Sequence, residues 1–315
     1  MRSHLARCFL IQRILPMSPK GALHTGLLLC WAMGMLLLSI SPVASQGHEA
    51  DLQWALSEQL LARGEPYRAI TEYERFLFYF PSDPRAGLAR VRILESYVAG
   101  KWWPEAARAA RETLGDAGLP PELRCRTLEL LGVCLMRMGD SAHARETLHS
   151  ALETCQDPPA RDRVRLLLAE LGANLGQWGA AARALEAVEG EGPNARVARE
   201  ESARIHRGEL SSRERSPWMA GALAALLPGA GHAYLGRWED AALVFTVNGA
   251  FLGATVEALE KDQPALAGAM ALAELLWYSG NIFGAVSSAH KHNRVLAQQW
   301  AEGTRSQLDF SGQRP

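Results

Sequence analysis

Charged and apolar residues occupy different parts of this chain. Charged side chains are dense between residues 50 and 215, whereas only eight lie between residues 217 and 289. The polar part repeats itself at a spacing typical of stacked helical hairpins, and the apolar part contains three stretches with almost no charge. The pattern therefore predicts an all-α protein with two regions, one exposed to water and one in contact with lipid.

Four glycines mark the repeat in the polar region. They are separated by 36, 39 and 37 residues, and an alanine follows three of them five positions later. A glycine ends the first helix of each pair and permits the turn, and the small residue lets the second helix pack closely on the first. One such pair cannot bury its own apolar face, so several pairs stack. The glycines are Gly64, Gly100, Gly139 and Gly176, and the alanines are Ala69, Ala144 and Ala181.

This pattern resembles the tetratricopeptide repeat over residues 46–194, although its spacing exceeds the family's period of about 34 residues. The resemblance implies a helical-hairpin solenoid whose first helices line a groove for a protein or peptide partner. A generic helical bundle is the alternative. The groove positions implied by the family are Trp54, Glu58, Leu61, Glu95, Arg126, Glu129, Arg137, Arg163, Glu170 and Asn174. Their mixed charges favour a protein or peptide over a polyanion, and the alternative for each residue is a solvated helix face.

The N-terminus has the composition of a signal peptide, which we assign to residues 1–45. Basic residues precede an uncharged run at 27–40, and small residues at positions 43 and 45 fit cleavage before Gln46. The alternative is an uncleaved membrane anchor, because the run approaches the length that spans a bilayer. Both alternatives export the repeats, which predicts a membrane-anchored protein of the bacterial cell envelope with periplasmic repeats.

Residues 217–293 form the predicted membrane-embedded domain, preceded by a capping helix and charged linker (195–216) and followed by a polar tail (294–315). Its first apolar stretch is interrupted by proline and glycine, the second covers 241–256 and the third 265–289. Because a spanning helix needs about 20 largely apolar residues, we predict two or three spans. Two GxxxG elements, which permit close packing of helices in lipid, are expected at helix contacts. They are Gly249 with Gly253 and Gly280 with Gly284. The alternative is a set of soluble helices that bury themselves against the repeats.

A turn rich in glycine lies between the first two apolar stretches, in the sequence PGAGHAYLGR. It resembles the turn of small bacterial membrane domains with paired transmembrane helices, which implies membrane placement and says nothing of chemistry. With three spans, Arg237 after this turn is expected to face the cytoplasm. The residues of the turn motif are Pro228, Gly229, Gly231, Tyr234 and Gly236.

Glu274 is the one charged residue of the third apolar stretch. Tyr278 and Asn281 share its helix face at i+4 and i+7, and Asn248 or His232 could face it from neighbouring segments. An ionisable residue inside a membrane is costly and by default a functional candidate. One interpretation is a proton-coupled or substrate-binding site. The other is interhelical hydrogen bonding that holds the helices together.

Composition excludes several classes of function. The 33 basic and 34 acidic residues leave a net charge of −1, without the basic excess of a nucleic-acid-binding protein. No nucleotide-binding, metalloprotease or calcium-binding motif is present, and the cysteines lack zinc-like spacing. We therefore predict a scaffold without catalytic activity, cofactor or metal, which holds a protein partner at the membrane. The alternative is an accessory subunit of a transporter or membrane enzyme that works through Glu274.

Three cysteines lie in the exported part of the chain. Cys125 opens one predicted helix and Cys155 closes the next, so an antiparallel hairpin could bring them together. A disulfide between them is one hypothesis for an oxidising compartment, and buried free thiols are the alternative. Cys134 lies nine residues from Cys125 on the same helix, which is too far for a bond between those two.

Overall fold

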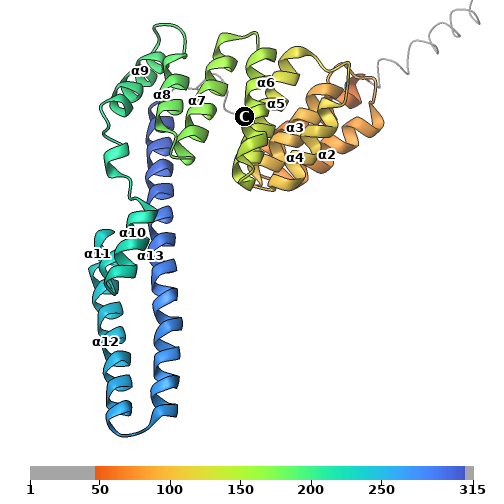
Figure 1. Cartoon of the computed structure of the whole chain (residues 1–315). Helices are drawn as coiled ribbons and strands as arrows, with labels where there is room; N and C mark the ends of the chain where they lie inside the picture. Colours follow the sequence, from red (N-terminus) through yellow and green to blue (C-terminus); the bar gives the residue numbers. More distant parts are fainter. Residues whose placement is uncertain (1–46, 309–315) are drawn as a thin grey trace, which may run out of the picture. The chain divides into compact units, whose positions relative to one another are not determined.

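The computed structural model describes residues 47–308, and within that range it contains helices and connecting turns but no strand (Figure 1). The predicted signal peptide and residues 309–315 lie outside the described range. By the packing of its helices the chain divides into two compact units, one ending at Ser96 and the other beginning at Tyr97. The helix over 47–62 is followed by α2 (Pro66–Tyr79), α3 (Ala86–Ala99), α4 (Trp103–Leu114), α5 (Pro121–Met138), α6 (Ser141–Thr154), α7 (Pro158–Asn174), α8 (Trp178–Glu186), α9 (Pro193–His206), a 3₁₀ turn (Ser211–Arg213), α10 (Pro217–Leu226), α11 (Ala230–Tyr234), α12 (Trp238–Glu260) and α13 (Pro264–Gln307).

The repeat turns have the local geometry that their glycines predict. Gly64, Gly139 and Gly176 all have positive φ angles, which an L side chain rarely adopts. The alanine five residues after each of them is fully buried between the two helices of its pair. The contact is close: in the fourth copy a methyl group on Gly172 would lie 2.9 Å from the backbone nitrogen of Ala181.

The second copy differs from the expected register by one residue. Lys101, not Gly100, takes the left-handed conformation, with φ at 61°. The buried Ala106 lies five residues after Lys101, so the spacing between turn and alanine is the same in all four copies. The turn positions are 64, 101, 139 and 176, with steps of 37, 38 and 37 residues. The repeat is therefore more regular in the structure than the glycines alone indicated.

Cys125 near the start of α5 and Cys155 after α6 form a disulfide, with their Cα atoms 5.0 Å apart. The antiparallel pairing of α5 and α6 brings the two positions together, as the disulfide hypothesis required. Cys134 is a free, fully buried thiol, and burial raises its pKa to about 11. At neutral pH Cys134 is therefore a protonated core residue rather than a reactive thiolate.

α13 extends well beyond the apolar stretch that was expected to form a membrane helix. Residues 294–307, which we assigned to a polar tail, are its last turns and pack against α7 and α9. The side chains of Leu296, Ala297, Trp300 and Ala301 are buried there. They recur at helical spacing, so one face of an otherwise polar segment is apolar enough to dock.

The charged linker between α9 and α10 is held against α13 by hydrogen bonds. The backbone nitrogen of Arg215 donates to the side-chain oxygen of Asn293 at 2.8 Å, and the Asn293 amide donates back to the Arg215 carbonyl at 2.9 Å. His292 Nε2 donates to the carbonyl of Arg213 at 3.1 Å. Each of these bonds joins residues nearly 80 positions apart, and the sequence offered no sign of them.

α10 and α11 form a short bent pair that lies along α13. α10 runs from the level of Asn293 to that of Tyr278, whose hydroxyl donates to the Ala225 carbonyl at 3.0 Å. α11 then returns, and Arg237 just after it bonds Ser288. Arg215 and Arg237 therefore lie at neighbouring levels beside the middle of α13, so α10 and α11 do not separate them as a first of three spans would. In the described range one helix, α12, is long and apolar enough to cross a membrane, and 17% of its apolar window is buried.

The turn motif is where the chain approaches itself most closely. Gly229 has a positive φ, and a methyl group there would lie 2.3 Å from the Ala241 carbonyl oxygen. A methyl group on Gly231 would lie 2.3 Å from the carbonyl oxygen of Ala220. Tyr234 anchors the turn by accepting a hydrogen bond from the backbone of Ser216 at 3.1 Å. Pro228 precedes the motif's first glycine, and Gly236 has a positive φ.

The GxxxG glycines do not make the contacts that were expected of them. Apart from the chain neighbours and the backbone of their own helix, no described atom lies within 4 Å of the position a Cβ would take on Gly249, Gly253 or Gly280. At Gly284 that position is 3.8 Å from the His232 ring, which is ordinary contact. The close approaches in this region involve glycines of α10 and α11, because those short helices fill the space beside α13.

A pair of glycine substitutions tests this assignment. Gly231→Ala is expected to destabilise the full chain in detergent by about 2 kcal/mol, because the new methyl group overpacks a backbone contact. Gly253→Ala should not destabilise the chain and should gain up to about 1 kcal/mol, because the site has room for a methyl group and alanine favours a helix interior. Denaturation followed by circular dichroism measures both. An equal loss in the two variants would contradict the packing described here.

Candidate interaction site

Two buried carboxylates organise the first helices of the third and fourth copies. Glu129 on α5 is buried and accepts hydrogen bonds from Arg126 at 2.9 Å and from Arg163 Nε on α7 at 3.3 Å. Glu170 on α7 is also buried, and it pairs with Arg137 on α5 at 3.6 Å. These five residues were all predicted groove positions. Charge neutralisation across α5 and α7 explains how two carboxylates tolerate burial.

α13 completes the site from the other side. Arg305 forms an ion pair with Glu170, and Trp300 lies against Trp178 with ring centroids 5.7 Å apart. The Trp300 indole nitrogen donates to Glu201 on α9 at 2.8 Å. The end of α13 is therefore fixed by an aromatic contact, a buried hydrogen bond and an ion pair.

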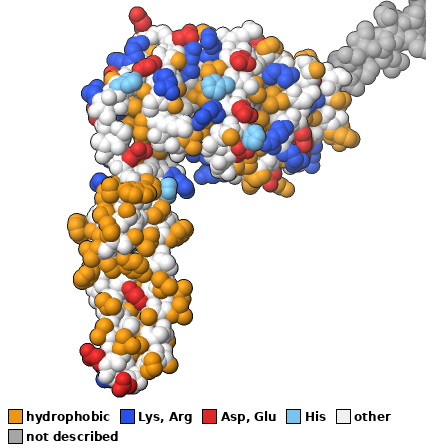
Figure 2. All heavy atoms as spheres, viewed as in Figure 1, with side chains coloured by type: hydrophobic (Ala, Val, Ile, Leu, Met, Phe, Trp, Pro, Cys, Tyr) orange, Lys and Arg blue, Asp and Glu red, His pale blue; other side chains and the backbone are white. Residues whose placement is uncertain are grey.

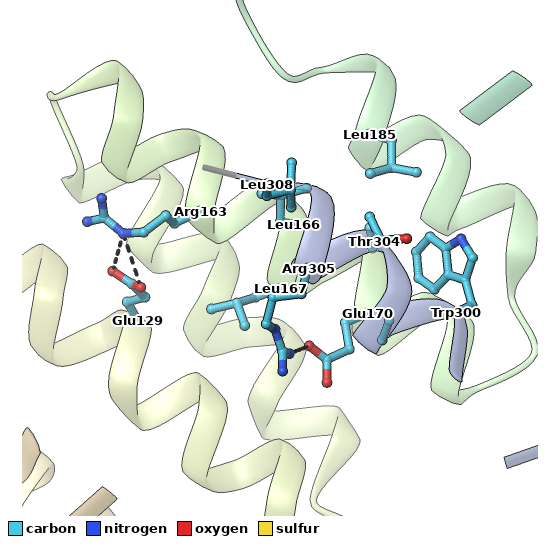
Figure 3. Close-up of a pocket in the computed structure, with 12 residues that line it drawn as sticks. Glu129, Arg163, Leu166, Leu167, Glu170, Leu185, Trp300, Thr304, Arg305 and Leu308 are labelled. Carbon is cyan, nitrogen blue, oxygen red and sulfur yellow. Dashed lines mark hydrogen bonds and ion pairs between the residues drawn. The ribbon is translucent and has the colours of Figure 1, made fainter. Parts of the chain in front are cut away.

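A pocket of about 220 Å³ lies between α5, α7, α8 and α13 (Figure 3). Its walls are apolar, and the ion pairs Glu129–Arg163 and Glu170–Arg305 stand at its edges. The hydroxyl oxygen of Thr304 is buried in the lining and has no hydrogen-bond partner among the described residues. The apolar walls are formed by Leu166, Leu167, Ala169, Leu185, Trp300, Ala301 and Leu308. The site is thus an apolar pocket bordered by two ion pairs, and its lining contains one buried hydroxyl without a hydrogen-bond partner.

Four of the predicted groove residues belong to the first unit, and three of them make internal contacts there. Trp54 packs edge-on against Tyr73 at 5.6 Å. Glu58 accepts hydrogen bonds from the Tyr73 hydroxyl at 2.8 Å and from Arg92 at 3.0 Å. Burial and the bond to Glu58 raise the pKa of Tyr73. Glu95 pairs with Arg92 at 2.8 Å. Leu61 is half-buried. In the second unit, Asn174 is exposed at the end of α7.

The part of the site that α13 supplies was not predicted from the sequence. Trp300, Thr304, Arg305 and Leu308 lay in the segment assigned to a polar tail. The signal that could have found them is the spacing of Leu296, Trp300, Thr304 and Leu308, which are four residues apart and share one helix face. The overall polarity of the segment hid that stripe.

Of the polar residues in the bent bundle of α10 to α13, His232 and Asn248 are buried, whereas Glu274, Tyr278 and Asn281 are partly exposed. Asn248 on α12 is buried, and its amide donates to the Val244 carbonyl of its own helix at 2.5 Å. Atoms of His232, Asn248, Glu274 and Asn281 are buried without partners among the described residues. Nothing in the described range gathers three or more His, Cys, Asp or Glu side chains in a way that suits a metal ion.

The surface of this bundle differs from that of the helices before it (Figure 2). Hydrophobic side chains cover α10, α12 and the first half of α13, whereas charged side chains are frequent on the helical repeats. Leu226 is 81% exposed and Trp218 is 76% exposed. The other large apolar side chains more than half exposed there are Leu227, Trp238, Leu243, Phe245, Leu252, Leu259, Leu272, Leu275, Leu276 and Phe283. An exposed apolar surface of this kind marks a site of contact with a membrane or another protein.

Comparison with known proteins gives similarity of fold only. No protein-family model matches the chain, and no curated protein matches its sequence. Among solved structures it is similar to a tetratricopeptide repeat protein from Parabacteroides merdae, at 14% identity over 80% of this chain and 99% of that one, with a TM-score of 0.42. It is also similar to pilF of Pseudomonas aeruginosa, at 17% identity over 75% of this chain and 95% of that one, with a TM-score of 0.38. A third is the Cut9–Hcn1 hetero-tetramer of the APC/C, at 18% identity over 86% of this chain and 45% of that one, with a TM-score of 0.37. At these scores, conclusions about function come from this chain's own residues.

Proposed function

We propose that this protein is a non-catalytic scaffold, anchored in the membrane by α10 to α13, which binds a protein partner through the pocket beside Trp300. The observation that carries the proposal is the apolar surface of the bundle, together with α13, the helix that runs from that surface to the pocket. One helix contributes both to the lipid-facing surface and to the partner site. The scaffold would therefore hold its partner at a fixed place relative to the bilayer.

The dimensions of α12 support insertion. Its 23 residues extend about 34 Å at 1.5 Å per residue, which exceeds the bilayer's hydrocarbon thickness of about 30 Å. A core helix of a soluble protein would be mostly buried, whereas α12 exposes most of its apolar side chains. With the first half of α13 as its antiparallel neighbour, the chain crosses twice. α10 and α11 enter the bundle from the repeat side and bend back toward it. The bend leaves the Ala225 carbonyl without a helical donor, and the Tyr278 hydroxyl donates a hydrogen bond to it.

Two kinds of evidence give opposite answers about which side of the membrane the repeats occupy. Arg213, Arg237, Lys291 and Arg294 lie at the repeat end of the bundle, and on their own they favour the cytoplasm for that end. The predicted signal peptide and the Cys125–Cys155 bond favour export, because disulfides persist in oxidising compartments. The first translocated segment usually decides orientation. We therefore place the repeats in the periplasm of a bacterial envelope.

The pocket suits one bulky apolar side chain of a partner protein or peptide. Its volume of about 220 Å³ matches a large aliphatic or aromatic residue, and the ion pairs Glu129–Arg163 and Glu170–Arg305 border it. Buried anchors of this kind carry most of the binding energy in protein interfaces.

Site-specific photo-crosslinking in cells tests both parts of the proposal. A benzophenone amino acid at Leu308, on the pocket edge, is expected to capture one discrete partner, and the adduct should remain in membranes washed with alkaline carbonate. The same group at Leu152, in a groove between α6, α7 and α8 outside this pocket, is the matched control. Leu166→Glu should abolish the adduct at Leu308, because it places a charge in the apolar wall.

The membrane anchor and the partner pocket are contradicted by different results. Release of the whole chain by carbonate would overturn the anchor. Identical adducts from positions 308 and 152, or an adduct at 308 that persists with Leu166→Glu, would overturn the pocket as the partner site.

A further inference from the structure

The membrane bundle contains a row of polar side chains, two buried and two partly exposed, that no structural role explains. We call it the polar seam and define it as His232, Asn248, Glu274 and Asn281. Among the described residues, eight buried side-chain atoms lack a hydrogen-bond partner, and four of them belong to the seam. His232 and Asn248 are 7% and 4% exposed. The unpaired polar atoms of this chain are therefore concentrated where the surroundings are most apolar.

The contacts of the bundle place the seam residues at neighbouring levels. Glu274 and Asn281 are seven residues apart and share one face of α13. The His232 ring lies next to Gly284, one turn further toward the repeats. α12 and α13 are antiparallel, and the bond between Arg237 and Ser288 sets their register. Asn248 is consequently level with Trp277, between Glu274 and Asn281.

The arrangement does not fit residues that only hold helices together. Interhelical polar contacts stabilise a membrane bundle by pairing donors with acceptors across helices. Here the Asn248 amide bonds its own helix, and the remaining seam atoms have no partner in the described chain. Leucine at these positions would pack without leaving polar atoms unpaired. What the seam offers instead is the Glu274 carboxyl, which shares a helix face with the Asn281 amide and can exist there as a neutral acid.

We propose that the polar seam is a reversible proton-binding site, in which the Glu274 carboxyl takes the proton and solvent on the repeat side supplies it past His232 and Asn281. The proposal rests on insertion of the bundle in the membrane. Among the described residues no second buried carboxyl continues the seam toward the 261–263 turn, so the proton returns to the side from which it came. The other ionisable groups near this path are His232 on α11, the Arg237–Asp240 ion pair at the repeat end and Tyr278, whose hydroxyl bonds Ala225.

Carbodiimide labelling of the full chain in phospholipid vesicles tests the site. Dicyclohexylcarbodiimide enters lipid and reacts with protonated carboxyl groups, so peptide mass spectrometry is expected to find the adduct on Glu274 at neutral pH. The adduct should be absent in Glu274→Gln and strongly reduced in alkaline buffer. Glu257→Gln, at the solvent-exposed end of α12, should leave labelling unchanged. A folded, vesicle-inserted chain without an adduct on Glu274 would overturn the proposal, as would labelling that is the same at neutral and alkaline pH.

The route to the carboxyl is tested by hydrogen–deuterium exchange. The carbonyl band of the protonated Glu274 acid shifts in D₂O, and infrared difference spectra against Glu274→Gln report how fast it does so. Asn281→Leu is expected to slow the exchange by about tenfold or more, because it removes the polar group on the path. Gly253→Ala, on the opposite, lipid-exposed side of α12, is the control. Exchange that is equally fast in Asn281→Leu and the wild type would overturn access through the seam. Failure of the bundle to insert would show separately, in the carbonate extraction described above.

Discussion

Replacing Trp300 by alanine is expected to lower the free energy of unfolding by about 3–5 kcal/mol. The Trp300 ring is buried against Trp178, and its indole nitrogen donates to the buried carboxylate of Glu201. The substitution removes the packing and deprives that carboxylate of one donor. The last turns of α13 should separate from α7 and α9. Urea denaturation of the full chain in detergent, followed by circular dichroism, measures the loss.

Trp300→Phe separates the packing from the hydrogen bond. It keeps most of the aromatic contact with Trp178 and removes the indole N–H, so its expected loss is about 1–2 kcal/mol. The photo-adduct at Leu308 should weaken with Trp300→Ala and persist with Trp300→Phe. If Trp300→Ala has the stability of the wild type, the end of α13 is not docked, and the pocket does not exist in the form described.

Removal of the disulfide is also expected to lower the free energy of unfolding strongly. The Cys125–Cys155 bond spans 30 residues, and the chain-entropy model assigns a crosslink of that length about 3.5 kcal/mol of stabilisation. The double variant Cys125→Ala/Cys155→Ala should therefore lose close to that amount relative to the oxidised wild type. Equilibrium denaturation of both proteins, with and without reductant, gives the difference.

Two controls make the disulfide prediction specific. Reductant should destabilise the wild type and leave the double variant unchanged. Cys134→Ala should keep its sensitivity to reductant, because Cys134 is free in the structure. Mass spectrometry of the mature protein that finds all three thiols alkylatable without reduction would contradict the bond, and with it one of the two reasons for placing the repeats outside the cytoplasm.

The repeats could be predicted from sequence to the extent that their signals are local. A glycine in a left-handed turn and an alanine five residues later act within one hairpin, so Gly64, Gly139 and Gly176 were correctly assigned. The second copy was misplaced by one residue because Lys101 adopts the same conformation without being glycine. Of the candidate site, the charged half on α5 and α7 was predicted, since those positions follow from the register of the repeat.

The other half of the site depends on contacts between distant parts of the chain. Arg305 is 135 residues away from its partner Glu170, and nothing near Arg305 indicates that pairing. For the GxxxG elements the reverse holds, because a local sequence signal is present but the helix contact it predicts is absent. Gly249 and Gly253 have the spacing of a packing motif, but the neighbouring helix lies elsewhere, since the glycines that approach α13 are on α10 and α11.

The sequence by itself determined the helical character of the chain, the partition between a charged and an apolar region, and the turns of three of the four repeats. These depend on composition and on residues a few positions apart. Only the tertiary structure decided that α10 and α11 bend back along α13, and that the last turns of α13 dock against α7 and α9 and complete the pocket. The physical reason is that both arrangements depend on which distant surfaces fit together, and helical periodicity shows that a face is apolar without specifying what will cover it.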